Sequence, residues 1–256
     1  MRRLRPLIGF ALALLVGLAV LMWFPRSRFT VLAVVRNQQF QEDRPVGYWA
    51  YELKDQDPKH REHAIRVLNS MGESARDAVP QLIEALHDKE DIVRILAALS
   101  LSKIGPDASE AVEELAKALT DEHPQVRMNS ALALTRIGPA AMPATPQLIA
   151  AMQDPDNREM VAPFRHSVRQ QAAMALANFG AAAHDAIPAL IDALSDSLHG
   201  TRFKAAYALG QIGPQASAAR EPLMLSLHDT DPLVADEAAW ALKRICPNDP
   251  EVANLP

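Results

Sequence analysis

Two kinds of side chain are scarce in this sequence: cysteine and the aromatic residues. Cys246 is the single cysteine, so an intrachain disulfide is impossible. Proteins without disulfides occur on either side of a membrane, which leaves the redox compartment open. Aromatic residues make up 5% of the 256 residues, although 49% are hydrophobic. Alanine and leucine supply most of the apolar content, which favours closely packed helices over a β-sandwich.

Most of the chain also lacks an excess of basic residues. Residues 1–44 carry a net charge of +5, and the remainder carries -10. Binding of nucleic acid needs a basic surface that neutralises phosphates, so the charge argues against nucleic acid as the main partner. An acidic body keeps a protein soluble and is compatible with basic partner surfaces.

One long hydrophobic run lies near the N-terminus. Leu7 to Phe24 is an uncharged stretch of 18 residues. As a helix it would span about 27 Å, close to the roughly 30 Å hydrocarbon core of a bilayer. We predict a signal anchor and transmembrane helix over residues 1–28, followed by a juxtamembrane linker over 29–45. A cleaved signal peptide is the alternative, but Trp23 to Arg26 fit a cleavage site poorly.

Arginines flank this run on both sides, so their distribution gives only a slight bias in orientation. Signal anchors of this layout more often keep the N-terminus in the cytoplasm. We therefore expect a single-pass inner or plasma membrane protein whose remaining chain is extracytoplasmic, which in a bacterium means periplasmic.

A repeat of 33 residues runs through the rest of the chain. Glycine marks it at Gly72, Gly105, Gly138, Gly180 and Gly213, and Cys246 holds the sixth position. The third step is longer by nine residues, which places an insertion at 155–167. Leucine stands four residues before every marker, and a small residue stands eight before. These offsets line one face of an α-helix, and the small residues allow a neighbouring helix to approach closely.

A second helical pattern follows each glycine, as in VPQLIEALHD at 79–88. Each unit is therefore predicted to be a first helix, a tight turn and a second helix. Residues 46–55 match the second pattern and should close the N-terminal end of a domain over 46–246. A C-terminal tail follows at 247–256. Trp240 shares a column with Leu99, Leu132, Met174 and Tyr207 and is expected to close the other end.

These columns resemble HEAT repeats, in the short form shared with HEAT-like repeats of phycobilisome-lyase type. Ankyrin repeats have a similar period, but their T-P-L-H signature is missing here. The resemblance implies an all-α fold: a right-handed α-solenoid of about six stacked helix pairs, following one N-terminal transmembrane helix. It implies a scaffold or assembly factor that binds another protein. The alternative is an enzyme or chaperone of bilin-lyase type that handles a tetrapyrrole or another small ligand.

HEAT repeats tie adjacent units together with a ladder of aspartates and arginines, and the matching columns occur here. The expected inter-repeat ladder consists of Asp55, Asp88, Asp121, Asp154, Asp196 and Asp229 with Arg61, Arg94, Arg127, Arg169 and Arg202. Arginine near a helix N-terminus opposes the helix macrodipole, so its recurrence there indicates a structural role. Ala235 holds the sixth arginine position.

Sequence motifs for catalysis are missing. No phosphate-binding glycine loop, GxSxG or HExxH occurs. Cys246 is interpreted as a packing residue, because no neighbouring basic group is implied that would lower the pKa of its thiol. Histidines at matching positions of neighbouring repeats would lie about 8–10 Å apart, too far to share one zinc ion. We predict a non-enzymatic protein with no catalytic residues, cofactor or metal.

Partner binding is expected on two parts of the solenoid. Exposed positions of the second helices should line its concave surface. They are Tyr48, Tyr51, Gln81, Glu84, Glu114, Lys117, Gln147 and Asp192. The insertion interrupts the repeat and could contact a partner, or its apolar residues could tuck against the stack. Its candidate residues are Met160, Phe164, Arg165 and His166.

Overall fold

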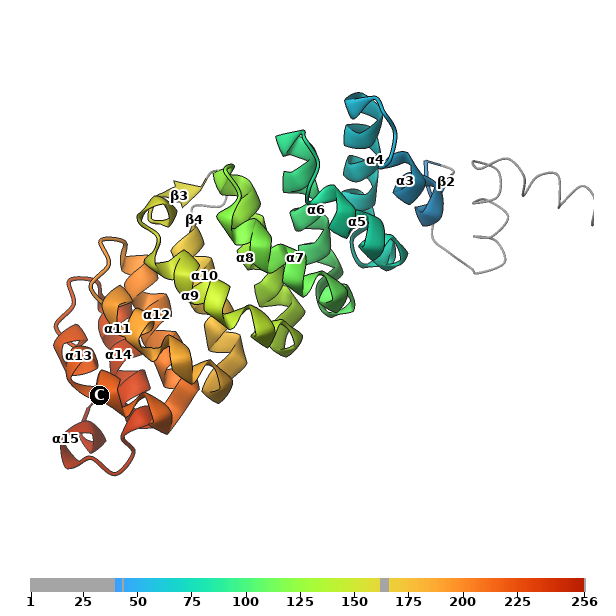
Figure 1. The fold of residues 1–256 in the computed structure, drawn as a ribbon. Coiled ribbons are helices and arrows are strands. Elements are labelled where there is room, and N and C mark those ends of the chain that lie inside the picture. The colour runs from blue at the N-terminus through green and yellow to red at the C-terminus, as the bar shows by residue number, and fades with distance from the viewer. Residues whose placement is uncertain (1–39, 43, 162–165, 256) are drawn as a thin grey trace, which may run out of the picture.

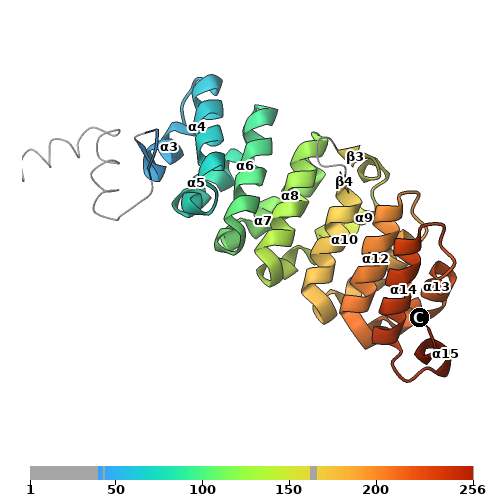
Figure 2. The ribbon, with the colours of Figure 1, turned by 180° about the vertical axis from the view of Figure 1, so that it is seen from behind.

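The computed structural model describes residues 40–42, 44–161 and 166–255. The predicted anchor and most of the predicted linker lie outside these residues. The described chain is an elongated array of helix pairs in two layers (Figures 1 and 2). The prediction of an all-α solenoid of stacked helix pairs is confirmed.

The first helix of each unit is long. Figure 2 shows these long helices side by side in one layer. They are α4 (Pro58–Met71), α6 (Asp91–Ile104), α8 (Pro124–Ile137), α10 (Val168–Phe179), α12 (His199–Ile212) and α14 (Pro232–Ile245).

The second helix of each unit is short, and the short helices form the other layer, which lies in front in Figure 1. They are α3 (Val46–Glu52), α5 (Val79–Ala85), α7 (Val112–Lys117), α9 (Thr145–Gln153), α11 (Ile187–Ala193) and α13 (Arg220–Ser226). The last helix, α15 (Pro250–Ala253), belongs to the C-terminal tail.

The marker glycines end five of the long helices. Each has a positive φ between 55° and 77°, a conformation that glycine adopts without the steric penalty other residues meet. A 3-10 helix of seven residues begins at each glycine: η1 (Gly72–Ala78), η2 (Gly105–Ala111), η4 (Gly138–Ala144), η6 (Gly180–Ala186) and η7 (Gly213–Ala219). Cys246 has a φ of -126°, so the sixth unit ends differently and leads into α15. The Cys246 side chain packs against the core.

The core lies between the two layers. The leucine four residues before each marker is fully buried in all six units, from Leu68 to Leu242. The short helices contribute a second column, in which Leu82, Leu115 and Leu148 are also fully buried. The two leucine columns that the 33-residue period predicts are therefore the ones that pack in the core between the two layers.

One described stretch, Val168–Ala193, is long and apolar enough to cross a membrane by length and composition alone. It consists of α10, η6 and α11, and the chain reverses within it at Gly180. Leu176 and Leu190 of this stretch are fully buried in the core of the array. The stretch Val168–Ala193 is apolar because its side chains help to form the core of the array.

The long helices are the more closely spaced layer. Neighbours such as α6 and α8 contact each other along their length, whereas successive short helices touch much less. Buried alanines such as Ala98 and Ala131 permit the close approach. The expectation that the second helices line a concave surface stays a prediction.

Two short antiparallel hairpins interrupt the helical pattern. In the first, β1 (Phe40–Gln41) pairs with β2 (Arg44–Pro45) just before α3. In the second, β3 (Met160–Val161) pairs with β4 (His166–Ser167). This second hairpin and the 3-10 turn η5 (Pro155–Asn157) make up the insertion.

Candidate interaction surface

A ladder of arginines and aspartates joins neighbouring units along one edge of the array. Arg61 donates to both carboxylate oxygens of Asp88, with Nε–Oδ2 2.7 Å and Nη2–Oδ1 2.9 Å. The two residues are 27 positions apart, so the pair joins the first turn of α4 to the turn that follows α5. Two further pairs repeat this two-point contact, Arg94 with Asp121 and Arg202 with Asp229. Arg169 forms an ion pair with Asp196.

The same arginines also bind the turn immediately before their own helix. Arg61 Nη1 donates to the carbonyl oxygen of Asp55, six residues earlier, at 3.0 Å. Arg94 and Arg202 do the same to Asp88 and Asp196. The aspartate six residues earlier thus supplies its carbonyl, and the next aspartate of the ladder, 27 residues later, supplies its carboxylate. These carbonyls offset the unfavourable position of an arginine in the first turn of a helix.

Burial and hydrogen bonding act against each other on the ladder carboxylates. Burial raises the pKa of Asp88, but the hydrogen bonds from Arg61 and from the Glu90 backbone outweigh it, so the pKa is lowered. The hydrogen bond from Arg202 likewise lowers the pKa of Asp229 against the effect of burial. Both carboxylates are therefore held in their charged form in the folded chain.

The ladder changes at the insertion. Arg127 Nε donates to Asn157 Oδ1 at 2.8 Å, and not to the carboxylate of Asp154. Asp154 instead accepts the backbone N–H of Asp156 and begins η5. Asn157 is almost fully buried and also donates to the Ala151 carbonyl. The prediction that Asp154 pairs with Arg127 is therefore wrong. The insertion places the neutral side-chain amide of Asn157 against Arg127 instead.

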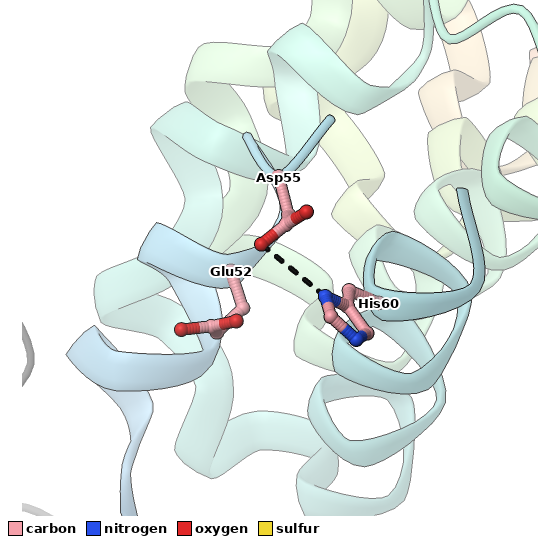
Figure 3. A group of neighbouring side chains, drawn as sticks. All are labelled: Glu52, Asp55 and His60. Carbon is pink, nitrogen blue, oxygen red and sulfur yellow. Dashed lines mark ion pairs between the residues drawn. The ribbon is translucent and has the colours of Figure 1, made fainter. Parts of the chain in front are cut away.

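The first rung has no preceding long helix among the described residues. Asp55 Oδ2, the oxygen that takes an arginine in later units, lies 3.3 Å from His60 Nδ1 (Figure 3). Ligand atoms of Glu52, Asp55 and His60 lie within 4.8 Å of one another. Carboxylates and imidazole can bind metals, but here they are the N-terminal end of the ladder.

The last rung is made by different residues. In place of the arginine missing at Ala235, Arg220 at the start of α13 donates to Asp249 and Glu251, each at 2.6 Å. Val252 in α15 is buried against the array. The C-terminal tail thus packs over the last unit.

The expected partner-binding residues of the second helices lie in the short-helix layer, where ion pairs link several of them. Lys54 pairs with Glu84 at 2.7 Å, across two units. His87 and Lys117 both contact Glu114 at 2.8 Å, and Lys117 lowers the pKa of that carboxyl. Gln147 and Asp192 are exposed, Gln81 is half-buried, and Tyr51 is 40% exposed. The guanidinium of Arg44 lies over the Tyr48 ring.

Two of the four candidate residues of the insertion are exposed on the surface of the structure. Met160 is 59% exposed at the start of the hairpin. His166 is exposed, and its Nδ1 lies 3.2 Å from Gln170 Oε1. Phe164 and Arg165 lie outside the described residues. Met160 is thus an exposed apolar side chain, while Val161 beside it packs against the core.

A surface that sequence reasoning did not select lies on the long helices. Leu99, Leu132, Met174, Tyr207 and Trp240 are all half-buried at the same position of successive long helices. We call this row the apolar stripe. Trp240 does not cap the end of the array: its ring stacks on Tyr207 with centroids 5.6 Å apart. The column of large apolar residues was visible in the sequence. Partly exposed apolar side chains in a row are typical of an interaction surface, and the structure shows that these five are only half-buried.

Two clefts open beside the ladder. One of about 490 Å³ is lined by residues that include Lys54, Arg61, Glu84 and Asp88. The other, of about 670 Å³, includes Arg169 and Asp196. These charged groups are paired with one another in both clefts. The ladder groups that line the two clefts are therefore engaged with one another.

Comparison with known proteins adds a family. A model of HEAT repeats matches residues 48–110, 106–167 and 164–243, which together cover more than half of the chain. No curated protein matches the chain.

Solved structures share the architecture. An engineered protein is 25% identical with a TM-score of 0.61, over 78% of this chain and 96% of its own. A designed armadillo repeat protein in complex with the peptide (KR)4 is 16% identical with a TM-score of 0.63, over 77% and 98%, a likeness of fold alone. The complex of CpcE and CpcF of phycocyanin lyase from Nostoc sp. PCC7120 is 25% identical with a TM-score of 0.54, over 81% and 77%.

Proposed function

Because this chain belongs to the family of HEAT-repeat proteins, we propose that it is a non-catalytic scaffold or assembly factor that binds another protein along its helical array. The observation that carries the proposal is the shape of the exposed surface. Stacked units present two continuous faces, one of long helices and one of short helices, over the length of the array (Figures 1 and 2). An extended surface of this kind suits a polypeptide partner better than a small molecule.

Crosslinking of the full-length protein in native membranes, followed by affinity capture and mass spectrometry, tests this function. We expect one dominant protein partner. Charge reversal on one face of the array should remove that partner, while reversal on the other face should leave it bound. A chain that captures no protein under any crosslinking condition contradicts the scaffold function.

The proposal includes a membrane anchor at residues 7–24 with the array outside the cytoplasm. The uncharged run of 18 residues supports it. Alkaline carbonate extraction should leave the full chain in the membrane fraction, and Leu14→Arg with Val16→Arg should release it. A C-terminal alkaline phosphatase fusion should be active, because that enzyme folds only outside the cytoplasm. Release of the unaltered chain, or an inactive fusion, contradicts the anchor or its orientation respectively.

A second candidate function is the handling of a tetrapyrrole or another small ligand. The likeness to the CpcE and CpcF complex of phycocyanin lyase favours it. The two functions separate on purification from the native cell. A chromophore with visible absorbance that co-purifies at a fixed ratio supports the second function, and a colourless protein with a polypeptide partner supports the first.

A further inference from the structure

Acidic residues are unevenly distributed between the two layers. The helices α6, α8, α10 and α12 contain a single acidic residue, Asp91, and it pairs with Arg94. Glutamate or aspartate occurs in four of the five short helices from α5 to α13, at Glu84, Glu113, Glu114, Asp192 and Glu221. The body of the chain is acidic overall, so the scarcity of acidic side chains on the central long helices is a local feature. The long helices at the two ends differ, because α4 carries Glu62 and α14 carries Asp236 and Glu237.

Basic side chains accompany the apolar stripe on that face. Lys103, Arg136 and Arg244 are exposed, and each stands four residues after a member of the stripe on its own helix. Lys103 Nζ donates to the Asn69 carbonyl at 3.1 Å, and Arg244 Nε donates to the Gly210 carbonyl at 2.8 Å. These contacts hold Lys103 and Arg244 along one edge of the stripe.

The C-terminal end of the stripe contains its two aromatic residues, Tyr207 and Trp240, with basic side chains beside them. The ring of Trp240 lies against Gly210, where an added Cβ would meet ring carbons at 2.3 Å and 2.8 Å. The Arg244 guanidinium lies 5.0 Å from the centroid of the Trp240 ring. Lys204 Nζ lies 5.9 Å from the centroid of Tyr207. The half-buried Glu237 of α14 interacts electrostatically with Lys204, so Arg244 is the cation here that supplies positive charge beside the aromatic surface.

We propose that the long-helix face binds an acidic polypeptide segment that carries regularly spaced apolar side chains. This inference rests on the proposed scaffold function and assigns it a surface and a class of partner. Apolar side chains of the segment contact Leu99, Leu132, Met174, Tyr207 and Trp240. Its carboxylates face the basic row formed by Lys103, Arg136 and Arg244. Charge complementarity selects the sign of the partner and speeds association.

Geometry suggests the spacing of the apolar residues in the segment. Neighbouring packed helices lie about 8–10 Å apart, so successive members of the stripe are separated by about the same distance. A polyproline II segment advances about 9.3 Å in three residues. A segment with an apolar residue at every third position therefore places one side chain on each unit, and about 13 residues reach from Leu99 to Trp240.

A synthetic peptide tests the inference directly. The probe is a fluorescently labelled 15-residue peptide with leucine at every third position and aspartate or glutamate at most others. Its binding to the full-length protein in detergent is followed by anisotropy. We expect saturable binding that weakens with added salt, because it depends in part on exposed charges. A peptide with lysine in place of every acidic residue should bind at least about tenfold more weakly.

Variants of the protein locate the surface. Lys103→Glu with Arg136→Glu should weaken binding of the acidic peptide about tenfold or more. The matched control, Glu84→Lys with Asp192→Lys on the short-helix face, should not weaken it. Gly210→Ala should also weaken binding, because it displaces the Trp240 ring and changes no charge. Circular dichroism melting identifies variants that fail to fold, and Lys103→Ser with Arg136→Ser is the milder replacement.

Several outcomes overturn the inference. They are equal or tighter binding of the lysine peptide, equal loss in both charge-reversal variants, and a stripe that is covered by a second copy of this chain. The last is detected as a dimer in light scattering that Gly210→Ala dissociates. If the natural partner is captured and lost on short-helix reversal alone, the scaffold function stands and this inference is wrong. If no protein is captured at all, the scaffold function itself is contradicted.

Discussion

Arg61, Arg94 and Arg202 each connect two backbone carbonyls of the turn before their own helix with the carboxylate of the next ladder aspartate. Arg61 is 14% exposed and Asp88 is 11% exposed, so little water competes for the pair. Hydrogen bonds between charged groups are stronger than neutral ones in such surroundings. The loss of one partner lowers the free energy of unfolding mainly because it leaves the other charged group buried without a hydrogen-bonding partner.

Removal of one ladder carboxylate should show this cost. Asp88→Ala leaves the half-buried Arg61 guanidinium without its carboxylate and also removes an acceptor for the Glu90 backbone N–H. We expect the free energy of unfolding to fall by about 1–3 kcal/mol, measured by urea denaturation. Lys89→Ala, which changes an exposed neighbour, is the control and should change stability little. Equal stability of the two variants would show that the ladder is energetically unimportant.

The lowered pKa values of Asp88 and Asp229 predict a dependence of stability on pH. A carboxyl whose pKa is lower in the folded chain stabilises the fold above its unfolded pKa of about 3.9. That contribution is lost as the pH falls through the lower, folded value. We expect the melting temperature to decrease on acidification below about pH 4.

The double variant Asp88→Asn with Asp229→Asn identifies the source of this dependence. It should be less stable than the unaltered chain at pH 7, and the difference should shrink as the pH falls. A constant difference between pH 7 and pH 3 would show that other carboxylates cause the acid sensitivity.

Among the elements, the insertion is the one that departs from the period. Other ladder pairs are separated by 27 residues, as in Arg94 and Asp121. Deletion of residues 157–165 gives Asp154-Pro-Asp-His-Ser-Val-Arg169, which restores both the spacing of six to Arg169 and the carboxylate 27 residues after Arg127. The shortened chain should therefore join Arg127 to Asp154 as the other units are joined.

We expect this deletion to leave the free energy of unfolding unchanged or higher. A charged acceptor replaces the amide of Asn157, and a shorter loop costs less entropy to close. Chemical denaturation measures the change, with Met160→Ser as a control that alters the hairpin and keeps its length. A loss of more than about 2 kcal/mol would mean that Asn157 and Val161 matter more to the fold than the missing rung.

The elements show where sequence reasoning succeeds and where it stops. Periodic burial predicted the paired helices, because each unit hides its apolar face only against its neighbours. The seven-residue 3-10 segments were not predicted, since residues such as those of GPDASEA suit several kinds of turn. The partner of Arg127 could not be read from spacing, because the insertion changes which side chain reaches it. The apolar stripe was seen as a column in the sequence, but only Trp240 was interpreted, as a residue that closes the end of the array.

At the scale of the whole molecule, the array has unequal ends. The central helix α6 buries ten of its fourteen residues, from Val93 to Ile104, whereas α4 buries four, Ala64, Ile65, Val67 and Leu68. At the other end α14 buries six residues, and α15 packs over it with Arg220 holding Asp249. In a stacked array each unit is stabilised by its neighbours, so a unit with fewer contacts opens more readily.

Hydrogen exchange of the full-length protein should reveal this gradient. We expect amides of α4 to exchange faster than those of α14, and both to exchange faster than those of α8, which is flanked by long helices on both sides. Leu242→Ala should remove buried contacts from the last unit and accelerate exchange in α14 while leaving α4 unchanged. Uniform protection across α4, α8 and α14 would instead mean that the array opens as a single cooperative unit, because local opening then costs as much as global unfolding.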